Sequence, residues 1–392
     1  MWLYLIIFFI PVIYYSSTVQ GKKQHVLFLA LFLLGLSLFV GLSDMFGGYD
    51  RYIYGEVFDN IADITSNKLS YVANGAFNYF PGERGYVLIN IILSFFTENR
   101  YIFILIYTVI IYAFLFVSFK RYIENYPIGI IFFFGLWFFF TFTYLRQVLG
   151  ATIVWLSFKY VIDRKLWKFI IVFLIACSIH KSAIIVFPVY FITTRKYSSR
   201  TIIVIALLLL LIGLSPIPNM LFDAYGDASI VERKADYNAS GGIRIPYLIE
   251  ASLFLYIILK NYTLILDKKI NIVMLNVGII FCLTLLFFVR SENGGRLSWY
   301  FLIGLIATLT HIITKKGVHN SLFPLMVIMS LILYLRVYFV WQNYLNLYPY
   351  KTFLTNGFRK GDFSYENYEY DHKYDDDKLY RTPFRYTLNI KP

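Results

Sequence analysis

The sequence predicts an all-α protein that crosses a membrane many times, and three observations carry this prediction. Of its 392 residues, 59% are hydrophobic and only 15% are charged, whereas soluble globular proteins carry about 25% charged residues. Apolar runs that approach the roughly 20 residues of a membrane-spanning helix recur along the chain. Basic residues stand in pairs at the ends of these runs, as they do in cytoplasmic loops.

Twelve apolar segments are expected to form the transmembrane helices. They cover residues 2–19, 26–43, 101–119, 128–145, 147–162, 167–179, 182–194, 201–217, 245–260, 270–289, 297–313 and 321–340. The first segment follows no basic residues and precedes no small-residue cleavage site, so we expect a retained helix rather than a signal peptide.

The basic pairs set the expected orientation. Placing them on the cytoplasmic side puts the N-terminus outside, together with loops 44–84, 218–244 and 290–296 and the chain after Trp341. The pairs are Lys22–Lys23, Lys120–Arg121, Arg164–Lys165, Arg195–Lys196, Lys268–Lys269 and Lys315–Lys316. They also account for most of the net charge of +13, so nucleic acid is not an expected partner.

Residues 86–97, "YVLINIILSFFT", are also apolar. Counting them as a membrane span would place Lys120–Arg121 on the outer side, against the expected orientation. Twelve helical residues reach only about 18 Å, which is short of the roughly 30 Å hydrocarbon core. We therefore expect a re-entrant or partly inserted segment. The alternative is that the basic-pair rule fails once at Lys120–Arg121.

Residues 167–194 are too long for one ordinary span and too short for two full ones. A hairpin of two short helices would place His180 and Lys181 at its outer apex. We expect residues 1–340 to form one transmembrane catalytic domain and residues 341–392 to form a polar extracytoplasmic tail rich in Tyr, Asp and Lys. Cys177 and Cys282 lie inside apolar runs and form no metal motif.

Cations that do not follow the positive-inside rule converge on the outer face. Arg146 is the only formally charged residue between positions 128 and 158, and Arg290 and Arg296 bracket another outer turn. Arg51, Arg84 and Arg244 belong to the two long outer loops. Charged groups near a membrane are costly and usually functional. Guanidinium groups bind phosphate bidentately, so the cluster suits a diphosphate on a polyprenyl lipid.

Simpler interpretations remain for each residue. Arg146 could extend its charge to the lipid headgroups, and His180 could be a polar helix-end residue bonded to backbone. The 290–296 turn could be an ordinary interfacial loop. Outer loops of this length also carry charges such as Arg51 and Arg84 by chance.

Four short motifs resemble the EpsG-like branch of the Wzy-type polysaccharide polymerases. They are "GGYDRYIY" (47–54), "GERGYVLIN" (82–90), "YLRQVLGA" (144–151) and "ACSIHKSAIIVFPVY" (176–190). The last two are the most specific, and in the first Tyr49 stands between Gly48 and Asp50. The resemblance spans roughly residues 40–300.

This resemblance implies the fold of C-type membrane glycosyltransferases and an activity. Such polymerases transfer a growing glycan from undecaprenyl diphosphate to the sugar end of a lipid-linked repeat unit, with no nucleotide sugar, cofactor or metal. On this basis Arg146, Arg290 and Arg296, assisted by Lys181, are assigned to the donor diphosphate. His180 is the candidate base or acceptor-orienting residue, with Asp50 and Glu83 as alternative bases.

Further candidate substrate-binding residues are Arg51, Tyr54, Arg84, Gln147 and Arg244. Tyr49, Tyr52, Tyr54 and Tyr79 would suit sugar stacking or interfacial anchoring. The implied partners are undecaprenyl-diphosphate-linked oligosaccharide, as donor and acceptor, and the lipid bilayer, and the resemblance leaves room for a chain-length regulator protein. The implied location is a bacterial cytoplasmic membrane, with the site facing outward.

Three alternatives stay open. A ligase of the O-antigen type would pass the glycan to a different acceptor. A flippase or exporter of the lipid-linked oligosaccharide would often carry repeat symmetry and a central path of charges, neither of which the sequence displays. A structural subunit would tolerate replacement of Arg146 and His180.

Overall fold

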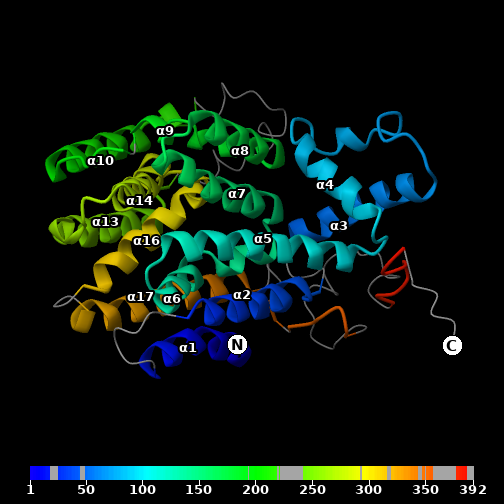
Figure 1. Ribbon diagram of the computed structural model, residues 1–392, viewed down its shortest axis with the longest axis horizontal. Helices are drawn as coiled ribbons and strands as arrows, with labels where there is room; N and C mark the ends of the chain where they lie inside the picture. Colours follow the sequence, from blue (N-terminus) through cyan, green and yellow to red (C-terminus); the bar gives the residue numbers. More distant parts are fainter. Residues whose placement is uncertain are drawn as a thin grey trace.

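A computed structural model describes residues 1–17, 25–44, 49–192, 194–218, 220, 242–291, 294–315, 319–342, 347–348, 350–355 and 377–385. Within these ranges the regular elements are helices (Figure 1), and the extended pairing consists of one isolated bridge between Ser43 and Thr352. The all-α prediction is confirmed. Most of the expected loop 218–244, residues 292–293 and most of the tail after Trp341 lie outside the described residues.

Most helices follow the apolar segments of the sequence. The expected outer loop 44–84 is not simply a loop, because its residues 49–66 form a helix that carries Asp50, Arg51, Glu56, Asp59 and Asp63. In chain order the α-helices are α1 (Trp2–Ser17), α2 (Val26–Gly41), α3 (Tyr49–Ser66), α4 (Arg84–Ser94), α5 (Arg100–Tyr122), α6 (Tyr126–Leu136), α7 (Leu145–Ile162), α8 (Leu166–Ile179), α9 (Val189–Ile192), α10 (Ser199–Leu214), α13 (Ile245–Lys260), α14 (Lys269–Phe287), α15 (Gly294–Ser298), α16 (Leu302–Ile313) and α17 (His319–Trp341). The 3-10 helices are η1 (Ala76–Asn78), η2 (Phe138–Phe142), η3 (Lys181–Val186), η4 (Tyr262–Leu264) and η5 (Trp299–Phe301).

Several of these helices have the length and composition of membrane spans. Among the described residues, five stretches qualify: Arg100–Tyr122, Leu145–Ile162, Lys269–Phe287, Gly294–Ile313 and Leu322–Trp341. Shorter helices occupy the other expected segments. The chain is therefore a membrane protein with several apolar helices, and the number of twelve crossings stays a prediction.

Three expected segments are not continuous α-helices. Segment 297–313 contains the 3-10 helix η5 between α15 and α16. In segment 128–145, α6 ends at Leu136, and the 3-10 helix η2 follows after Trp137. This stretch is almost entirely aromatic, and aromatic side chains lose rotamer freedom in an α-helix. In segment 182–194, the 3-10 helix η3 replaces most of the expected helix, and α9 adds only four residues.

The helices lie side by side as a bundle (Figure 1). Helix α14 packs against α16, α10 and α13, and α7 packs against α5 and α8. Two glycines bring α14 and α16 into backbone contact: a Cβ on Gly304 would lie 2.7 Å from the backbone nitrogen of Gly278. Small residues permit such close approach between apolar helices.

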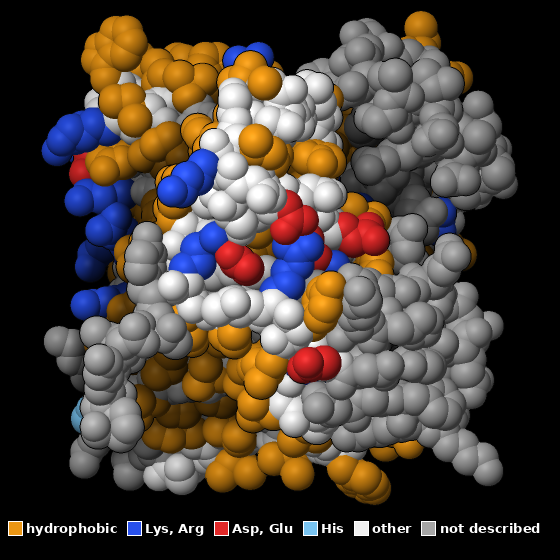
Figure 2. Space-filling view, turned by 90° about the vertical axis from the view of Figure 1, so that its right-hand side faces the viewer, with side chains coloured by type: hydrophobic (Ala, Val, Ile, Leu, Met, Phe, Trp, Pro, Cys, Tyr) orange, Lys and Arg blue, Asp and Glu red, His pale blue; other side chains and the backbone are white. Residues whose placement is uncertain are grey.

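Helices α3 and α4 form a cap at one end of the bundle, on the right of Figure 1. They enclose a small apolar cluster of their own, separate from the main core, which includes Val57, Ile61, Val87 and Ile91. Figure 2 looks onto this end of the molecule. Acidic and basic side chains lie next to one another in a central band, with hydrophobic areas above and below it.

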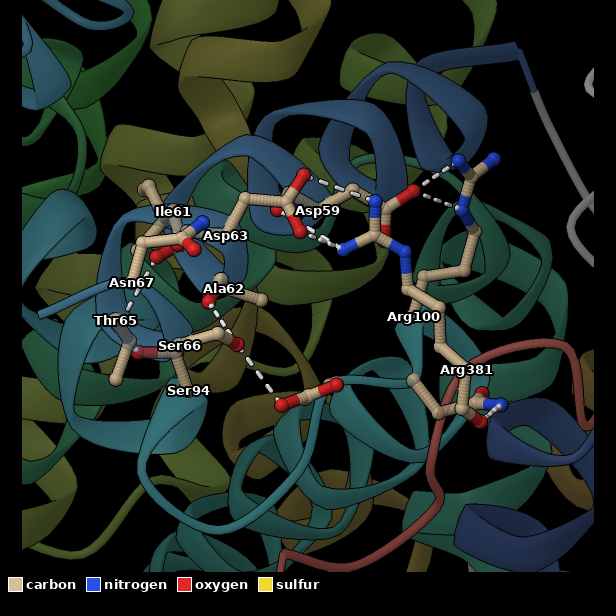
Figure 3. Close-up of polar contacts among 12 residues, drawn as sticks. Asp59, Ile61, Ala62, Asp63, Thr65, Ser66, Asn67, Ser94, Arg100 and Arg381 are labelled. Atoms are coloured by element: carbon tan, nitrogen blue, oxygen red, sulfur yellow. Dashed lines mark hydrogen bonds and ion pairs between the residues drawn. The ribbon is translucent and has the colours of Figure 1, made fainter.

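The segment 377–385 from the end of the chain packs against this cap (Figure 1). Arg381 pairs with Asp63 of α3, and Arg100 of α5 pairs with Asp59 (Figure 3). Lys378 Nζ lies 3.2 Å from both carboxylate oxygens of Asp44. The described part of the tail is therefore bound to the body of the protein through several charged contacts.

Candidate functional site

Arg146 is the point at which all four sequence motifs meet. The Arg146 guanidinium forms an ion pair with the Glu83 carboxylate, and its central carbon lies 5.3 Å from the Tyr54 ring centroid. The backbone nitrogen of Lys181 donates to Glu83 Oε1 at 3.0 Å. Motifs separated by more than a hundred residues in sequence thus form one polar cluster.

The ion pair with Glu83 explains how the apolar segment 128–158 accommodates the charge of Arg146. Arg146 is 18% exposed and Glu83 9% exposed, so each charge is partly withdrawn from solvent and is compensated by the other. Because removing either partner would leave the other charge partly buried and without its counter-ion, Arg146 and Glu83 depend on each other. Extension of Arg146 to lipid headgroups is not the arrangement that the structure shows.

Aromatic rings surround the Arg146 side chain. Its guanidinium carbon lies 3.9 Å from the Phe80 ring centroid and 5.6 Å from that of Tyr86. Aromatic faces attract cations, most strongly in desolvated places. Burial raises the pKa of Tyr54 to about 12, so this phenol stays neutral beside the charge.

Close helix packing brings Glu83 to Lys181. Gly85, in the first turn of α4, faces the end of α8, where a Cβ would lie 2.9 Å from Ser178 Cβ and 3.0 Å from the Ser178 carbonyl oxygen. Only glycine fits this approach without displacement. The glycine in the "GERGY" motif therefore places Glu83 against the turn that carries His180 and Lys181.

That turn matches the expected hairpin apex. Helix α8 ends at Ile179, His180 is extended with φ −149° and ψ 117°, and η3 begins at Lys181. His180 Nδ1 lies 2.7 Å from Ser182 Oγ, and Ser182 Oγ lies 2.8 Å from Tyr300 Oη. The fully buried Tyr300 joins the cluster from η5.

Gln147 links the cluster around Arg146 to a second cluster, formed by Arg296 and Tyr144. Its side-chain nitrogen donates to the backbone oxygen of Arg296 at 3.1 Å. Arg296 in turn donates to Tyr144 Oη at 2.8 Å, and its guanidinium carbon lies 4.0 Å from the Tyr144 ring centroid. The start of α7 thus positions both Arg146 and Arg296.

Arg296 lines a cavity of about 400 Å³ between η2, α13, α14, α15 and α17. Arg244 and Arg336 also line it, and Arg336 pairs with Glu250 at 2.9 Å. Leu136, Leu285, Leu333 and Val337 are among the apolar side chains that also line it. The cavity therefore combines three guanidinium-bearing residues with apolar and aromatic side chains, as ligand pockets often do.

Arg51 lies elsewhere and is fully buried. Its guanidinium donates to the backbone oxygens of Val40, Gly41 and Ser43 and to Ser43 Oγ, at 2.8 to 3.0 Å. Burial lowers its pKa to about 10, so it remains charged at neutral pH. This geometry assigns Arg51 a structural role in place of the expected contact with substrate.

The remaining expected site residues, Arg84, Asp50 and Arg290, are more exposed than Glu83. Arg84 is exposed at the first residue of α4, next to Glu83, and Asp50 is half-buried in the first turn of α3. Arg290 is exposed and donates to the Leu214 backbone oxygen at 3.1 Å, and it does not line the cavity with Arg296. The side chain of Tyr49 lies outside the described residues.

Sequence reasoning missed several side chains of the two clusters. Ser182 stands inside the quoted "HKSA" motif, so its spacing of two from His180 was the available signal. Tyr144 likewise precedes "LRQ" directly. Tyr300, Glu250 and Arg336 carry no local signal, because only the packing of distant helices brings them to these places.

Comparisons with known proteins give one result. A family model described as the EpsG family matches residues 26–352, which is most of the chain. Neither the curated proteins nor the solved structures contain a match.

Proposed function

The chain belongs to the EpsG family, and from this we propose that it is a polysaccharide polymerase of a bacterial cytoplasmic membrane, with its site on the outer side. The substrates proposed are glycans on undecaprenyl diphosphate, as donor and as acceptor. The observation that carries the proposal is the convergence of the four motifs on the Glu83–Arg146 pair.

The donor diphosphate is assigned to the cavity beside α17. Arg296 and Arg244 line this cavity, and guanidinium groups recognise phosphate oxygens bidentately. Most residues of the apolar stretch Leu322–Trp341 are not buried inside the protein, so this wall suits the hydrocarbon chain of a lipid. In this assignment Arg146 does not contact the diphosphate, because it does not line the cavity. It holds Glu83 in place through their ion pair, and the next residue, Gln147, holds Arg296 through its backbone oxygen.

The reaction is a transfer of a glycosyl group. The bond between the anomeric carbon of the donor and a diphosphate oxygen breaks, and its electron pair leaves with the diphosphate. A bond forms between that carbon and an acceptor hydroxyl, whose proton passes to the Glu83 carboxylate or to His180. Arginines placed where the negative charge develops stabilise the transition state, and each preorganised donor is worth about 10²–10³ in rate.

The test uses purified protein in nanodiscs with synthetic undecaprenyl-diphosphate-linked repeat units. We expect wild type to produce a ladder of glycans on one lipid, read by gel or mass spectrometry, without nucleotide. Arg146→Ala, His180→Ala and Arg296→Ala should lose the ladder. Arg290→Ala should lose less activity than Arg296→Ala, because Arg290 lies outside the cavity lining.

The matched control is Arg200→Ala, an exposed arginine in α10, which should leave the ladder unchanged. A product on a different acceptor would identify a ligase. If the wild type yields no glycan product but moves substrate across proteoliposome membranes, the polymerase proposal is wrong and a flippase is the better description.

A further inference from the structure

His180 holds its turn through one ring nitrogen. As the residue before η3, its Nδ1 accepts a hydrogen bond from the backbone N–H of Ser182 at 3.3 Å. A backbone N–H can only donate, so Nδ1 must be an acceptor and carries no proton. In a neutral imidazole the proton then resides on Nε2.

The neighbouring hydroxyl groups agree with this assignment. Ser182 Oγ lies 2.7 Å from Nδ1, and Tyr300 Oη lies 2.8 Å from Ser182 Oγ. Since Nδ1 is an acceptor, the Ser182 hydroxyl donates to it, and the Tyr300 hydroxyl can donate to Ser182 Oγ. A proton on Nδ1 would instead face the Ser182 N–H, and the two would repel each other.

The surrounding packing keeps this arrangement in place. Tyr300 is fully buried, and its backbone oxygen accepts a hydrogen bond from Trp155 Nε1 at 3.1 Å. Gly150 of α7 lies against the same place, where a Cβ would lie 3.3 Å from His180 Cβ and 3.7 Å from Tyr300 Oη. The Ser182 N–H selects the tautomer, and the packing of α7 and η5 keeps His180, Ser182 and Tyr300 next to one another.

We propose that His180 serves the transfer reaction as a hydrogen-bond donor through Nε2–H, and not as the general base. This inference rests on the proposed function and chooses between its two proton acceptors. A ring nitrogen that already carries a proton cannot take one from the acceptor hydroxyl. The hydroxyl proton passes instead to the Glu83 carboxylate, which contacts the same turn through the Lys181 backbone nitrogen.

The first test reads the tautomer directly. The chain has five histidines, so wild type with ¹⁵N-labelled imidazoles is compared with His180→Gln in proteoliposomes by solid-state NMR. The difference spectrum isolates the two ring nitrogens of His180. We expect a protonated Nε2 and an unprotonated Nδ1, whereas a protonated Nδ1 beside a bare Nε2 would overturn the proposal.

The second test compares three replacements of the same side chain. Glutamine places an N–H donor where Nε2 stands, so His180→Gln should retain much more polymerisation than His180→Ala, which loses one donor worth about 10²–10³ in rate. Asparagine can still cap the turn through its oxygen, yet it is too short to supply the distant donor. His180→Asn should therefore fold like wild type and be as inactive as His180→Ala.

The outcomes separate this inference from the proposed function. If His180→Gln is as inactive as His180→Ala while both fold, the donor role is wrong. If His180→Asn is as active as His180→Gln, the side chain acts only as a cap, and the inference fails. A wild-type protein without polymerase activity would refute the proposed function, while the NMR spectrum would still decide the tautomer.

Discussion

Arg51 and Arg146 show that two arginines with the same sequence-based prediction, a place on the outer face, can have different roles. Arg51 donates to three backbone oxygens at the end of α2 and has no exposed surface. Arg146 instead pairs with a carboxylate from a different helix and remains partly exposed. Sequence alone presented both as outer-face cations, and only their partners distinguish a structural residue from a candidate functional one.

At this scale we predict that Arg51→Lys destabilises the protein. Lysine keeps the charge but cannot donate from a planar fork to several carbonyls, and each charged hydrogen bond lost costs about 1.5–3 kcal/mol. The melting temperature in detergent, measured by tryptophan fluorescence, should fall. Arg84→Lys, at an exposed position in α4, is the control and should melt like wild type.

Activity separates this role from substrate binding. If Arg51→Lys melts like wild type but shows a raised KM for the lipid-linked acceptor, Arg51 contacts substrate, and the structural assignment is incorrect.

At the scale of elements, close contact between α14 and α16 sets the geometry below the candidate site. Helix α16 follows η5, which carries Tyr300, and α14 lines the cavity with Phe281 and Leu285. The backbones meet at Gly278 and Gly304. A change in this spacing would therefore move Tyr300 and the cavity wall together.

We predict that Gly304→Ala lowers stability and activity together. Its Cβ would lie 2.5 Å from Val277 Cγ1 and 2.7 Å from the Gly278 backbone nitrogen, and overpacking of this kind costs about 1–3 kcal/mol. The matched control is Gly35→Ala in α2, where a Cβ meets nothing within 4 Å.

The two melting temperatures should move in different directions, because alanine also favours a helix over glycine by about 1 kcal/mol. Equal melting temperatures for Gly304→Ala and wild type would mean that α14 and α16 separate without cost.

At the scale of the whole molecule, the end of the chain fastens the cap to the bundle. Lys378 reaches Asp44 after α2, and its Nζ lies 2.8 Å from Tyr101 Oη in α5. Arg385 donates to the backbone oxygens of Ser94 and Ala62. One short segment therefore contacts α3, α4 and α5, and holds in place the cap that supplies Tyr54 and Glu83 to the candidate site.

We predict that Lys378→Met loosens this cap. Lys378 and Asp44 are 3% and 5% exposed, and removing one partner of a buried pair costs up to about 3–5 kcal/mol. We expect the lower end of this range, because Tyr101 Oη still donates to Asp44 at 3.0 Å and Arg51 lies near enough to attract it. Tryptic cleavage at Arg381 should accelerate, and the melting temperature should fall. Lys168→Met, an exposed lysine in α8, should change neither.

The double variant Asp44→Asn with Lys378→Met removes both charges. It should recover part of the lost stability, since the buried side chain that has lost its Lys378 partner no longer carries a charge. A double variant no more stable than Lys378→Met alone would contradict a role for this charge pair.

Much of the helix content could be predicted from sequence, because apolar periodicity and length act locally. The helical parts of each expected segment and the turn at His180 follow from composition within a few residues. The break at Trp137 and the 3-10 character of η3 could not be predicted in this way, since both depend on packing against neighbouring helices. For the candidate site, motif spacing indicated Arg146, His180 and Glu83 but not Tyr300 or Arg336.

The sequence by itself determined that this is an apolar, helical membrane protein with unusual cations between its helices, because burial of hydrophobic surface and the cost of charge in lipid act on each segment separately. Tertiary structure alone decided which cations have partners: Arg146 meets Glu83, Arg51 meets backbone oxygens, and Arg296 lines a cavity. It also placed the Ser182 backbone N–H against Nδ1 of His180, which is the basis of the proposed tautomer. The pairings of the arginines depend on contacts between residues far apart in the chain, which no local pattern encodes.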